Sequence, residues 1–469
     1  MPRGGHRGGG DGRRAAERGG RAGGRGGDRG AHLGGLRGGG RGARGAPRGA
    51  RELRAGGGGR ERGQRVRSRL RRAARRGAAP RRAGAGAVTA AAVASPVSLR
   101  WRDEFPIFRQ RTYLNSCSLG ALARRSRERV LEHLDLWEAR GAAAWYDTWW
   151  AALAELRAGY GRVIGADADE IALHPCISTA LTTVASTLDH GRRPKVVVTA
   201  LDFPTIAYQW LARAGQGVEV EVLESPDGVT VPLELYERAI DDRTALVATS
   251  HVFFATGAIQ DIGAIARLAH ARGARCLVDG YQGAGQVPVD VHAAGVDFYC
   301  GGGLKWLLGG TGVAFLYARR DLLPTLHPAA TGWFAHAEQF RFDPRHLVRH
   351  ADARRLELGT PPLLPVYAQL GGLEVLEAVG LEEVRRVTHA LSEDLIEGAR
   401  AQGLRPRVAP HAAERSAIVM LPHDDPHAEV ARLAAAGFTV DARPGHVRVS
   451  PYFYNLPDDH RALLEQLRR

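Results

Sequence analysis

The stretch that decides the fold is residues 279–317, which read DGYQGAGQVPVDVHAAGVDFYCGGGLKWLLGGTGVAFLY. Two short apolar runs, 298–300 and 313–317, flank a glycine-rich loop that contains Lys305. A third apolar run ends directly before Asp279. Short apolar runs bounded by turn residues are typical of buried strands, and ligands of open α/β sheets bind just beyond the ends of such strands. The stretch therefore predicts buried strands that present Asp279 and Lys305 to a ligand.

Elsewhere in the chain, short apolar runs alternate with segments of helical periodicity. Further apolar runs occur at 170–173, 195–199, 218–223 and 245–249, and segments with helical periodicity lie between them. Continuous apolar runs that alternate with helices predict an α/β fold with a mostly parallel sheet covered on both faces. From about residue 375 onward, long helices alternate with the runs 417–421 and 446–450, which predicts a smaller C-terminal α/β domain.

The first part of the chain differs from the rest in charge. Residues 1–99 hold 25 arginines, no lysine and 5 acidic residues, whereas the other 370 residues hold 40 basic and 45 acidic ones. A segment of glycine, arginine and alanine cannot bury enough apolar surface to fold, so we predict a disordered tail over 1–97. The remainder divides into an N-terminal segment with a large domain, 98–350, and a linker with a small domain, 351–469.

Three interpretations of the tail remain open. Its composition favours an over-extended translation start in a GC-rich gene, with the true start near Val88 or Val93. It could also be an inert tail, or an arm that binds RNA through arginine and phosphate. Against the RNA-binding arm, residues 1–86 contain no aromatic side chain that could stack on bases. Nucleic acid is therefore an unlikely partner of this chain.

Several classes of protein are excluded by composition. No run of about 18 apolar residues is present, so no membrane span is expected. The four cysteines, at 117, 176, 276 and 300, are too few for a disulfide scaffold in a body of this size. They show no CxxC spacing, which argues against a structural zinc site. We expect a cytoplasmic protein without a metal.

Lys305 is one of only two lysines among 65 basic residues. The other, Lys195, opens an apolar run after Arg-Arg-Pro and is typical of a solvated surface. Arginine replaces lysine on most surfaces but cannot form a Schiff base, so a lysine retained in a glycine-rich loop is a candidate for covalent chemistry. A surface lysine and a phosphate-contacting lysine remain simpler alternatives. The chain has no GxxxxGK[ST] motif, which excludes a P-loop.

Asp279 favours the covalent alternative. It lies 26 residues before Lys305, at the end of a predicted strand. There its carboxylate could keep the ring nitrogen of pyridoxal phosphate protonated, which maintains the ring as an electron sink. Gln282 could then hydrogen-bond to the 3-oxygen of the ring. An aspartate in this position can also simply cap a helix.

With these residues in view, 279–317 resembles the core of the class V aminotransferase group of pyridoxal phosphate enzymes. That group includes kynureninases, cysteine desulfurases, some epimerases and C–S lyases. The shared pattern is Asp-x-x-Gln/His, followed by Pro-Val-Asp, Gly-Val-Asp-Phe and the lysine. The resemblance extends over roughly 110–469. Three further segments are similar to the kynureninase branch, namely Tyr113–Gly120, Leu136–Trp145 and Gly332–Phe334.

The resemblance implies a fold-type I enzyme, a homodimer with shared active sites, and a role for each matching residue. Lys305 would bind the cofactor covalently, and Arg448 would clamp the substrate carboxylate through its planar fork. The remaining cofactor roles fall on Asp279 at the ring nitrogen, Gln282 at the 3-oxygen, Phe203 stacked on the ring, Ser178 and Thr179 at the phosphate, and Thr360 at the phosphate of the partner subunit. Asn115 and Trp333 would lie near the substrate. For Phe203, Ser178 and Arg448 the plainer alternatives are a core residue, a helix cap and an exposed strand residue.

The chain also departs from the group. Gly302 and Leu304 stand where desulfurases have serine and histidine and where kynureninases have tyrosine, and Ile206 replaces an aspartate of kynureninases. No cysteine follows Cys300, which excludes a persulfide mechanism that needs a mobile cysteine after the lysine. We therefore expect an aminotransferase acting on an amino acid. The alternatives are a pyridoxal phosphate-dependent lyase or hydrolase, an epimerase, and a catalytically inactive binding protein with an RNA-binding tail.

Overall fold

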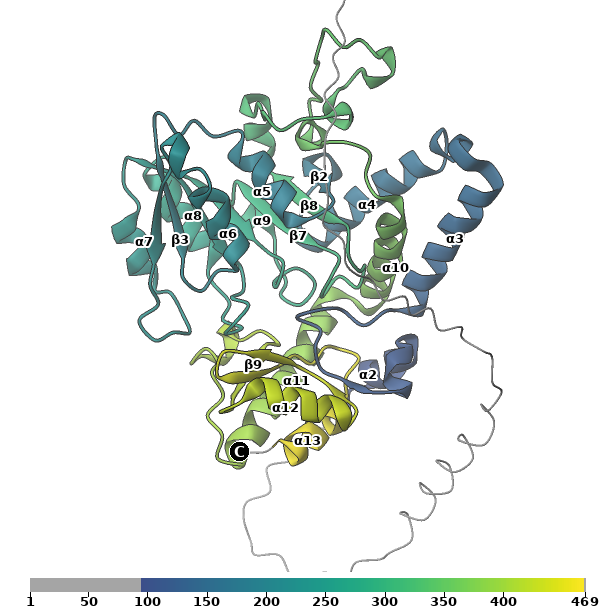
Figure 1. The fold of residues 1–469 in the computed structure, drawn as a ribbon, viewed down its shortest axis with the longest axis vertical. Helices are drawn as coiled ribbons and strands as arrows, with labels where there is room; N and C mark the ends of the chain where they lie inside the picture. Colours follow the sequence, from purple (N-terminus) through teal and green to yellow (C-terminus); the bar gives the residue numbers. More distant parts are fainter. Residues whose placement is uncertain (1–93, 468–469) are drawn as a thin grey trace, which may run out of the picture. The chain divides into compact units, whose positions relative to one another are not determined.

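A seven-stranded sheet forms the centre of the computed structural model, which describes residues 94–467 (Figure 1). Its order is β2-β8-β7-β6-β5-β3-β4. The strands are β2 (Ile171–His174), β3 (Lys195–Thr199), β4 (Glu219–Leu223), β5 (Thr244–Ser250), β6 (Arg275–Asp279), β7 (Phe298–Gly302) and β8 (Ala314–Ala318). Strands β3 to β7 pair in parallel, whereas β8 runs antiparallel to both β7 and β2. The predicted α/β fold with a mostly parallel sheet is confirmed.

Helices cover both faces of this sheet because alternate strand residues point to opposite sides. On β3, Val196 and Val198 join one buried cluster with helices α5 (Ile177–Ala185) and α6 (Pro204–Leu211). Val197 joins the other cluster. The helices that contribute to that second cluster include α3 (Arg124–Arg140), α4 (Trp149–Ile164), α7 (Leu233–Ala239), α8 (Ile262–Ala271), α9 (Val291–Ala294), α10 (Leu363–Val379) and α11 (Leu381–Ala401).

A second, smaller sheet lies in the C-terminal part of the chain. It contains β11 (Asp441–Arg443), β12 (His446–Val449) and β9 (Val419–Pro422), all antiparallel. Helices α11 (Leu381–Ala401), α12 (Pro426–Ala435) and α13 (Pro457–Gln466) accompany it, and β1 (Thr112–Tyr113) pairs with β10 (Phe438–Thr439). Val447 and Val449 are buried in an apolar cluster on one face of β12, which leaves Arg448 on the other face.

The predicted domain boundaries, at residues 97 and 350, stay predictions. Helix α2 (Pro96–Trp101) begins just inside the predicted tail, and the rest of that tail lies outside the described residues. All described residues belong to one compact unit, so the division at residue 350 stays a prediction. Within 94–467 no helix is long and apolar enough to cross a membrane.

The parallel strands direct the candidate residues to a single edge of the sheet. Asp279 is the last residue of β6, Ser250 the last of β5, and Gly302, three residues before Lys305, the last of β7. The carboxyl ends of parallel strands meet at one edge, which is where ligands of such sheets bind. The fold thus brings together residues that are far apart in the sequence.

Candidate active site

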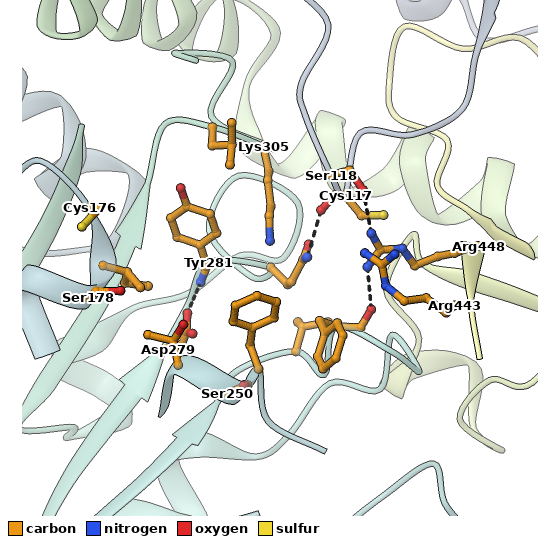
Figure 2. Close-up of a pocket in the computed structure, with 17 residues that line it drawn as sticks. Cys117, Ser118, Cys176, Ser178, Ser250, Asp279, Tyr281, Lys305, Arg443 and Arg448 are labelled. Carbon is orange, nitrogen blue, oxygen red and sulfur yellow. Dashed lines mark hydrogen bonds between the residues drawn. The ribbon is translucent and has the colours of Figure 1, made fainter. Parts of the chain in front are cut away.

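A cavity of about 370 Å³ lies at the carboxyl ends of the strands (Figure 2). Of the ten predicted site residues, the cavity is lined by Ser178, Phe203, Asp279, Gln282, Lys305 and Arg448. The other four, Thr179, Asn115, Trp333 and Thr360, do not line it. Its remaining walls are largely apolar, with Ile177, Val252, Phe254 and Leu304 among them.

Lys305 extends into this cavity from a tightly held loop. The carbonyl of Leu304 accepts a hydrogen bond from the backbone N–H of Gly120 at 2.9 Å. A Cβ at Gly120 would lie 2.1 Å from the Lys305 carbonyl oxygen, so only glycine permits this approach. Burial lowers the pKa of the Lys305 amine to about 8, which makes a neutral, nucleophilic amine accessible near physiological pH.

Asp279 provides the buried carboxylate of the site. One of its oxygens accepts a hydrogen bond from the backbone N–H of Tyr281 at 2.8 Å. Burial raises its pKa to about 6, and the neighbouring charge of Lys305 acts in the opposite direction. Burial destabilises the charged form of a carboxylate, so a cationic partner stabilises it. A protonated pyridine nitrogen is such a partner.

Gln282 and Phe203 line the cavity in different ways. The Gln282 amide is already paired, because its nitrogen donates to the Cys117 carbonyl at 3.0 Å and its oxygen accepts from the Trp306 indole at 2.8 Å. Its second N–H is the one group left to donate to a ligand. Phe203 is 45% exposed, and its ring packs edge-on against Phe254 with centroids 5.2 Å apart. The alternative of a core residue for Phe203 is therefore wrong.

The start of helix α5 closes one end of the cavity. Ile177 and Ser178 begin its first turn, and the side chain of the preceding Cys176 caps no backbone N–H group of that turn. Uncapped N–H groups and the helix dipole attract anions, above all a phosphate. Thr179 directs its hydroxyl back to the Cys176 carbonyl at 2.7 Å, so its side chain serves the helix start and not the cavity.

Two arginines occupy the opposite end of the cavity from Cys176 and Ser178 (Figure 2). The hairpin of β11 and β12 pairs Asp441 directly with Arg448, and the Asp441 carboxylate forms ion pairs with Arg448 at 2.6 Å and with Arg443 at 2.9 Å. Arg448 is 2% exposed and also donates to the Ser118 hydroxyl at 2.6 Å and to the Phe254 carbonyl at 3.0 Å. It is therefore not an exposed strand residue.

The guanidinium of Arg448, which was predicted to clamp the substrate carboxylate, already has partners within the protein. The Nη2 atom of Arg448 is engaged by Asp441 and Ser118, while its buried Nε has no hydrogen-bond partner. Arg443 lines the cavity beside it, and burial lowers the pKa of its guanidinium. Two guanidinium groups and one carboxylate leave a net charge of about +1, which matches one carboxylate of a substrate.

The four predicted residues outside the cavity occupy separate places. Asn115 forms a bridge with Ser450 beside the lining residues Cys117 and Ser118. Trp333 donates its indole N–H to the Gln339 carbonyl at 2.9 Å. Thr360 is exposed in the segment that precedes α10. Their predicted roles at substrate or cofactor remain predictions.

Sequence reasoning missed several lining residues, of which Arg443 and Tyr281 are the most informative. Arg443 shares a face of the small sheet with Arg448 only because the turn at Gly445, with φ +69°, sets the hairpin register. Tyr281 lies within the decisive stretch, between Asp279 and Gln282. The sequence feature that could have indicated Tyr281 is the glycine at 302, because a Cβ there would lie 2.5 Å from the Tyr281 ring.

The donor set fits pyridoxal phosphate. The cavity combines an amine of lowered pKa, a buried carboxylate, aromatic side chains and a helix start, which correspond to the aldehyde, the ring nitrogen, the ring face and the phosphate. Among residues 94–467 no cluster of three metal-ligating side chains occurs.

Comparison with known proteins agrees with this geometry. The family model "Aminotransferase class-V" matches residues 138–459. An uncharacterised aminotransferase of Bacillus subtilis is 34% identical over 78% of this chain and 96% of its own length. A kynureninase of Pseudomonas fluorescens is 31% identical over 73% of this chain and 84% of its own length.

Solved structures show the same fold. A cysteine desulfurase of Thermococcus onnurineus superposes with a TM-score of 0.72 at 23% identity, covering 80% of this chain and 98% of its own. A cystine C–S lyase, solved with its reaction product cysteine persulfide, gives a TM-score of 0.71 at 23% identity, covering 77% and 98% of the two chains. At this identity the likeness concerns the fold.

Proposed function

Because the chain belongs to the class-V aminotransferase family of pyridoxal phosphate-dependent enzymes, we propose that it moves the amino group of an α-amino acid to a 2-oxo acid. One observation carries this proposal. A single cavity holds the Lys305 amine, the Asp279 carboxylate and the Arg443–Arg448 pair, with the arginines at the opposite end from the start of α5. That arrangement orients an amino acid between a proton carrier and a carboxylate site.

Pyridoxal phosphate, when bound, supplies an aldehyde that condenses with amines and a ring that takes up negative charge. Lys305 would hold the cofactor and, once displaced by the substrate amine, would take a proton from the α-carbon of the substrate. The same amine would later donate a proton, so that Lys305 would serve in turn as base and as acid in each half of the transfer. Its pKa of about 8 keeps both protonation states populated, as a group that accepts and then donates a proton requires. Asp279 keeps the ring nitrogen protonated.

The arginine pair sets the orientation of the substrate. A carboxylate bound at Arg443 and Arg448 neutralises the charge of about +1 that remains after Asp441 is counted. The α-amino group of the substrate then lies toward Lys305. The side chain of the substrate contacts the apolar wall formed by Phe254 and Val252. Orientation of this kind accounts for much of the rate enhancement that enzymes achieve.

A pyridoxal phosphate-dependent lyase or hydrolase is the second candidate. The similarity to a kynureninase favours it, as does the apolar wall at Phe254, which suits a large side chain. Such a reaction needs a positioned water or a leaving group on the substrate in addition to Lys305.

Product analysis separates the two candidates. Purified enzyme is incubated with single amino acids in the presence and absence of pyruvate or 2-oxoglutarate. We expect a new amino acid to form from the added 2-oxo acid, in an amount equal to the 2-oxo acid formed from the donor. Turnover that needs no 2-oxo acid and cleaves the side chain would replace this proposal by the lyase or hydrolase.

We also propose a cytoplasmic homodimer. Thr360 is exposed outside the cavity of its own chain, as a residue that serves the partner's phosphate would be. The lining residues near α5 include no basic side chain, which leaves space for a donor from a second subunit. The four cysteines are unpaired, which supports a reducing compartment.

A further inference from the structure

Tyr281 lies against Lys305 in a position that no role described so far explains. The Lys305 amine is 4.6 Å from the centroid of the Tyr281 ring and 6.0 Å from that of Phe203. Both rings line the cavity that contains Asp279. In Figure 2 the Tyr281 ring stands beside the Lys305 side chain, with its backbone nitrogen at Asp279.

The two rings are carried by segments that follow different strands of the sheet. Phe203 follows β3 and packs against Phe254, which follows β5. Tyr281 follows β6 and packs toward β7, because Gly302 leaves space for its ring and a Cβ there would lie 2.5 Å from Cε2. Strand β6, which ends in Asp279, separates β5 from β7 in the sheet. The rings therefore flank the site on its β5 and β7 sides.

Tyr281 is also held in place. Its backbone N–H donates to Asp279 at 2.8 Å, and its ring would collide with any side chain at position 302. A ring fixed in this way presents a face at little entropic cost when a flat ligand arrives. Planar aromatic groups gain free energy from such faces through offset stacking and burial.

We infer that Tyr281 is a second ring-binding residue, which forms with Phe203 a slot of two aromatic side chains for the pyridine ring of pyridoxal phosphate. The inference rests on the cofactor assignment and goes beyond it, since the ring is held on two faces and the contribution of Tyr281 is its aromatic face. The glycine at 302 then has a function, because it makes room for this ring beside Lys305.

The test measures dissociation constants of the full-length apoprotein for pyridoxal phosphate and for pyridoxal, which lacks the phosphate. Tyr281→Ala is expected to weaken the binding of both ligands by about tenfold or more, because each loses the same stacked face. Tyr281→Phe keeps the face and should stay within about threefold of the wild type. Tyr208→Ala, at a 64% exposed tyrosine on α6, is the matched control and should bind both ligands normally.

A second variant tests the same ring without removing it. Gly302→Ala must displace the Tyr281 ring and should weaken both ligands, but in the Tyr281→Ala background it should add less than about twofold. Circular dichroism and thermal melting confirm that each variant is folded. Unchanged binding in Tyr281→Ala, an equal loss in Tyr281→Phe, or a loss for pyridoxal phosphate alone would overturn the inference. A wild type that binds neither ligand would instead refute the cofactor assignment.

Discussion

At the scale of single residues, Asp279 is the group whose charge matters most to the cofactor. Asp279→Ala should weaken pyridoxal phosphate binding by roughly 10- to 100-fold, since a hydrogen bond between charged groups contributes about 1.5–3 kcal/mol. Equilibrium titration of the apoprotein measures this loss. Asp279→Asn preserves the shape of the side chain and should show a similar loss, because the charge is what the ring nitrogen requires.

The same residue predicts a pH dependence. Burial raises the pKa of Asp279 to about 6, so its carboxylate becomes protonated as the pH falls through 6 and no longer pairs with a protonated ring nitrogen. The affinity of the wild type for the cofactor should therefore decrease as the pH is lowered through 6. The affinity of Asp279→Asn should not change over the same range. The same slope in both proteins would assign the titration to another group.

Lys305 predicts a second dependence on pH, of the same sign but at higher pH. Burial lowers its pKa to about 8, so about half of the amine is neutral at pH 8 and nearly all of it is neutral at about pH 9. The rate at which pyridoxal attaches covalently to the apoprotein should therefore rise with pH and level off at about pH 9. An unperturbed lysine would keep gaining rate up to its ordinary pKa of 10.5, and such a profile would contradict the buried environment.

How far the sequence predicts these residues depends on what holds them. Lys305 and Asp279 were predictable because each follows a continuous apolar strand, and their positions at strand ends need no knowledge of the partner strands. Arg443 was not predictable, since its place beside Arg448 depends on the hairpin register. Predicting Tyr281 would have required knowing that Gly302 packs against it, which is a contact between the turn after β6 and the end of β7.

At the scale of elements, a buried ion pair joins α4 to the segment that precedes α10. Glu357 accepts from Arg157 at 2.7 Å and from the backbone N–H of Leu173 on β2 at 3.0 Å. Burial raises the pKa of Glu357 against the pull of Arg157, so the pair itself adds little net stability. Removing one partner is different, because it leaves the other charge buried without a counter-ion.

We therefore expect Glu357→Gln to lower the free energy of unfolding by about 3 kcal/mol or more. Denaturant unfolding monitored by circular dichroism measures the change. The control is Asp169→Asn, which removes a carboxylate that pairs with Arg320 at the surface and should cost less than about 1 kcal/mol. An equal decrease in the free energy of unfolding in the two variants would contradict the buried environment of the Glu357–Arg157 pair.

Elements also show where sequence patterns stop being informative. The apolar run at 195–199 predicted β3 with its observed bounds, because a strand buried on both faces leaves a continuous signal. Strands β10 and β11 were not predicted, since they are two and three residues long and partly exposed. The antiparallel direction of β8 was also missed, because direction leaves no trace in the composition of a strand.

At the scale of the whole molecule, the proposed dimer makes each site depend on two chains. Lys305→Ala and Thr360→Ala subunits are each expected to have little activity alone. Mixed dimers should regain about a quarter to a half of the wild-type activity per dimer, because one of the two sites then contains both Lys305 and Thr360. Confirmed heterodimers without recovered activity would place both residues in the site of a single subunit.

Lys305 is the residue that we propose binds pyridoxal phosphate, and the chain allows a direct test because it contains only one other lysine. The measurement is borohydride reduction of the protein with added cofactor, followed by peptide mapping. Lys195 is the internal control, since Glu221 and Asp241 raise its pKa despite partial burial and leave it a poor nucleophile. We expect a yellow protein before reduction, and after reduction we expect the cofactor to be attached to Lys305 alone. A protein that stays colourless with added cofactor, or a label on Lys195, would contradict it.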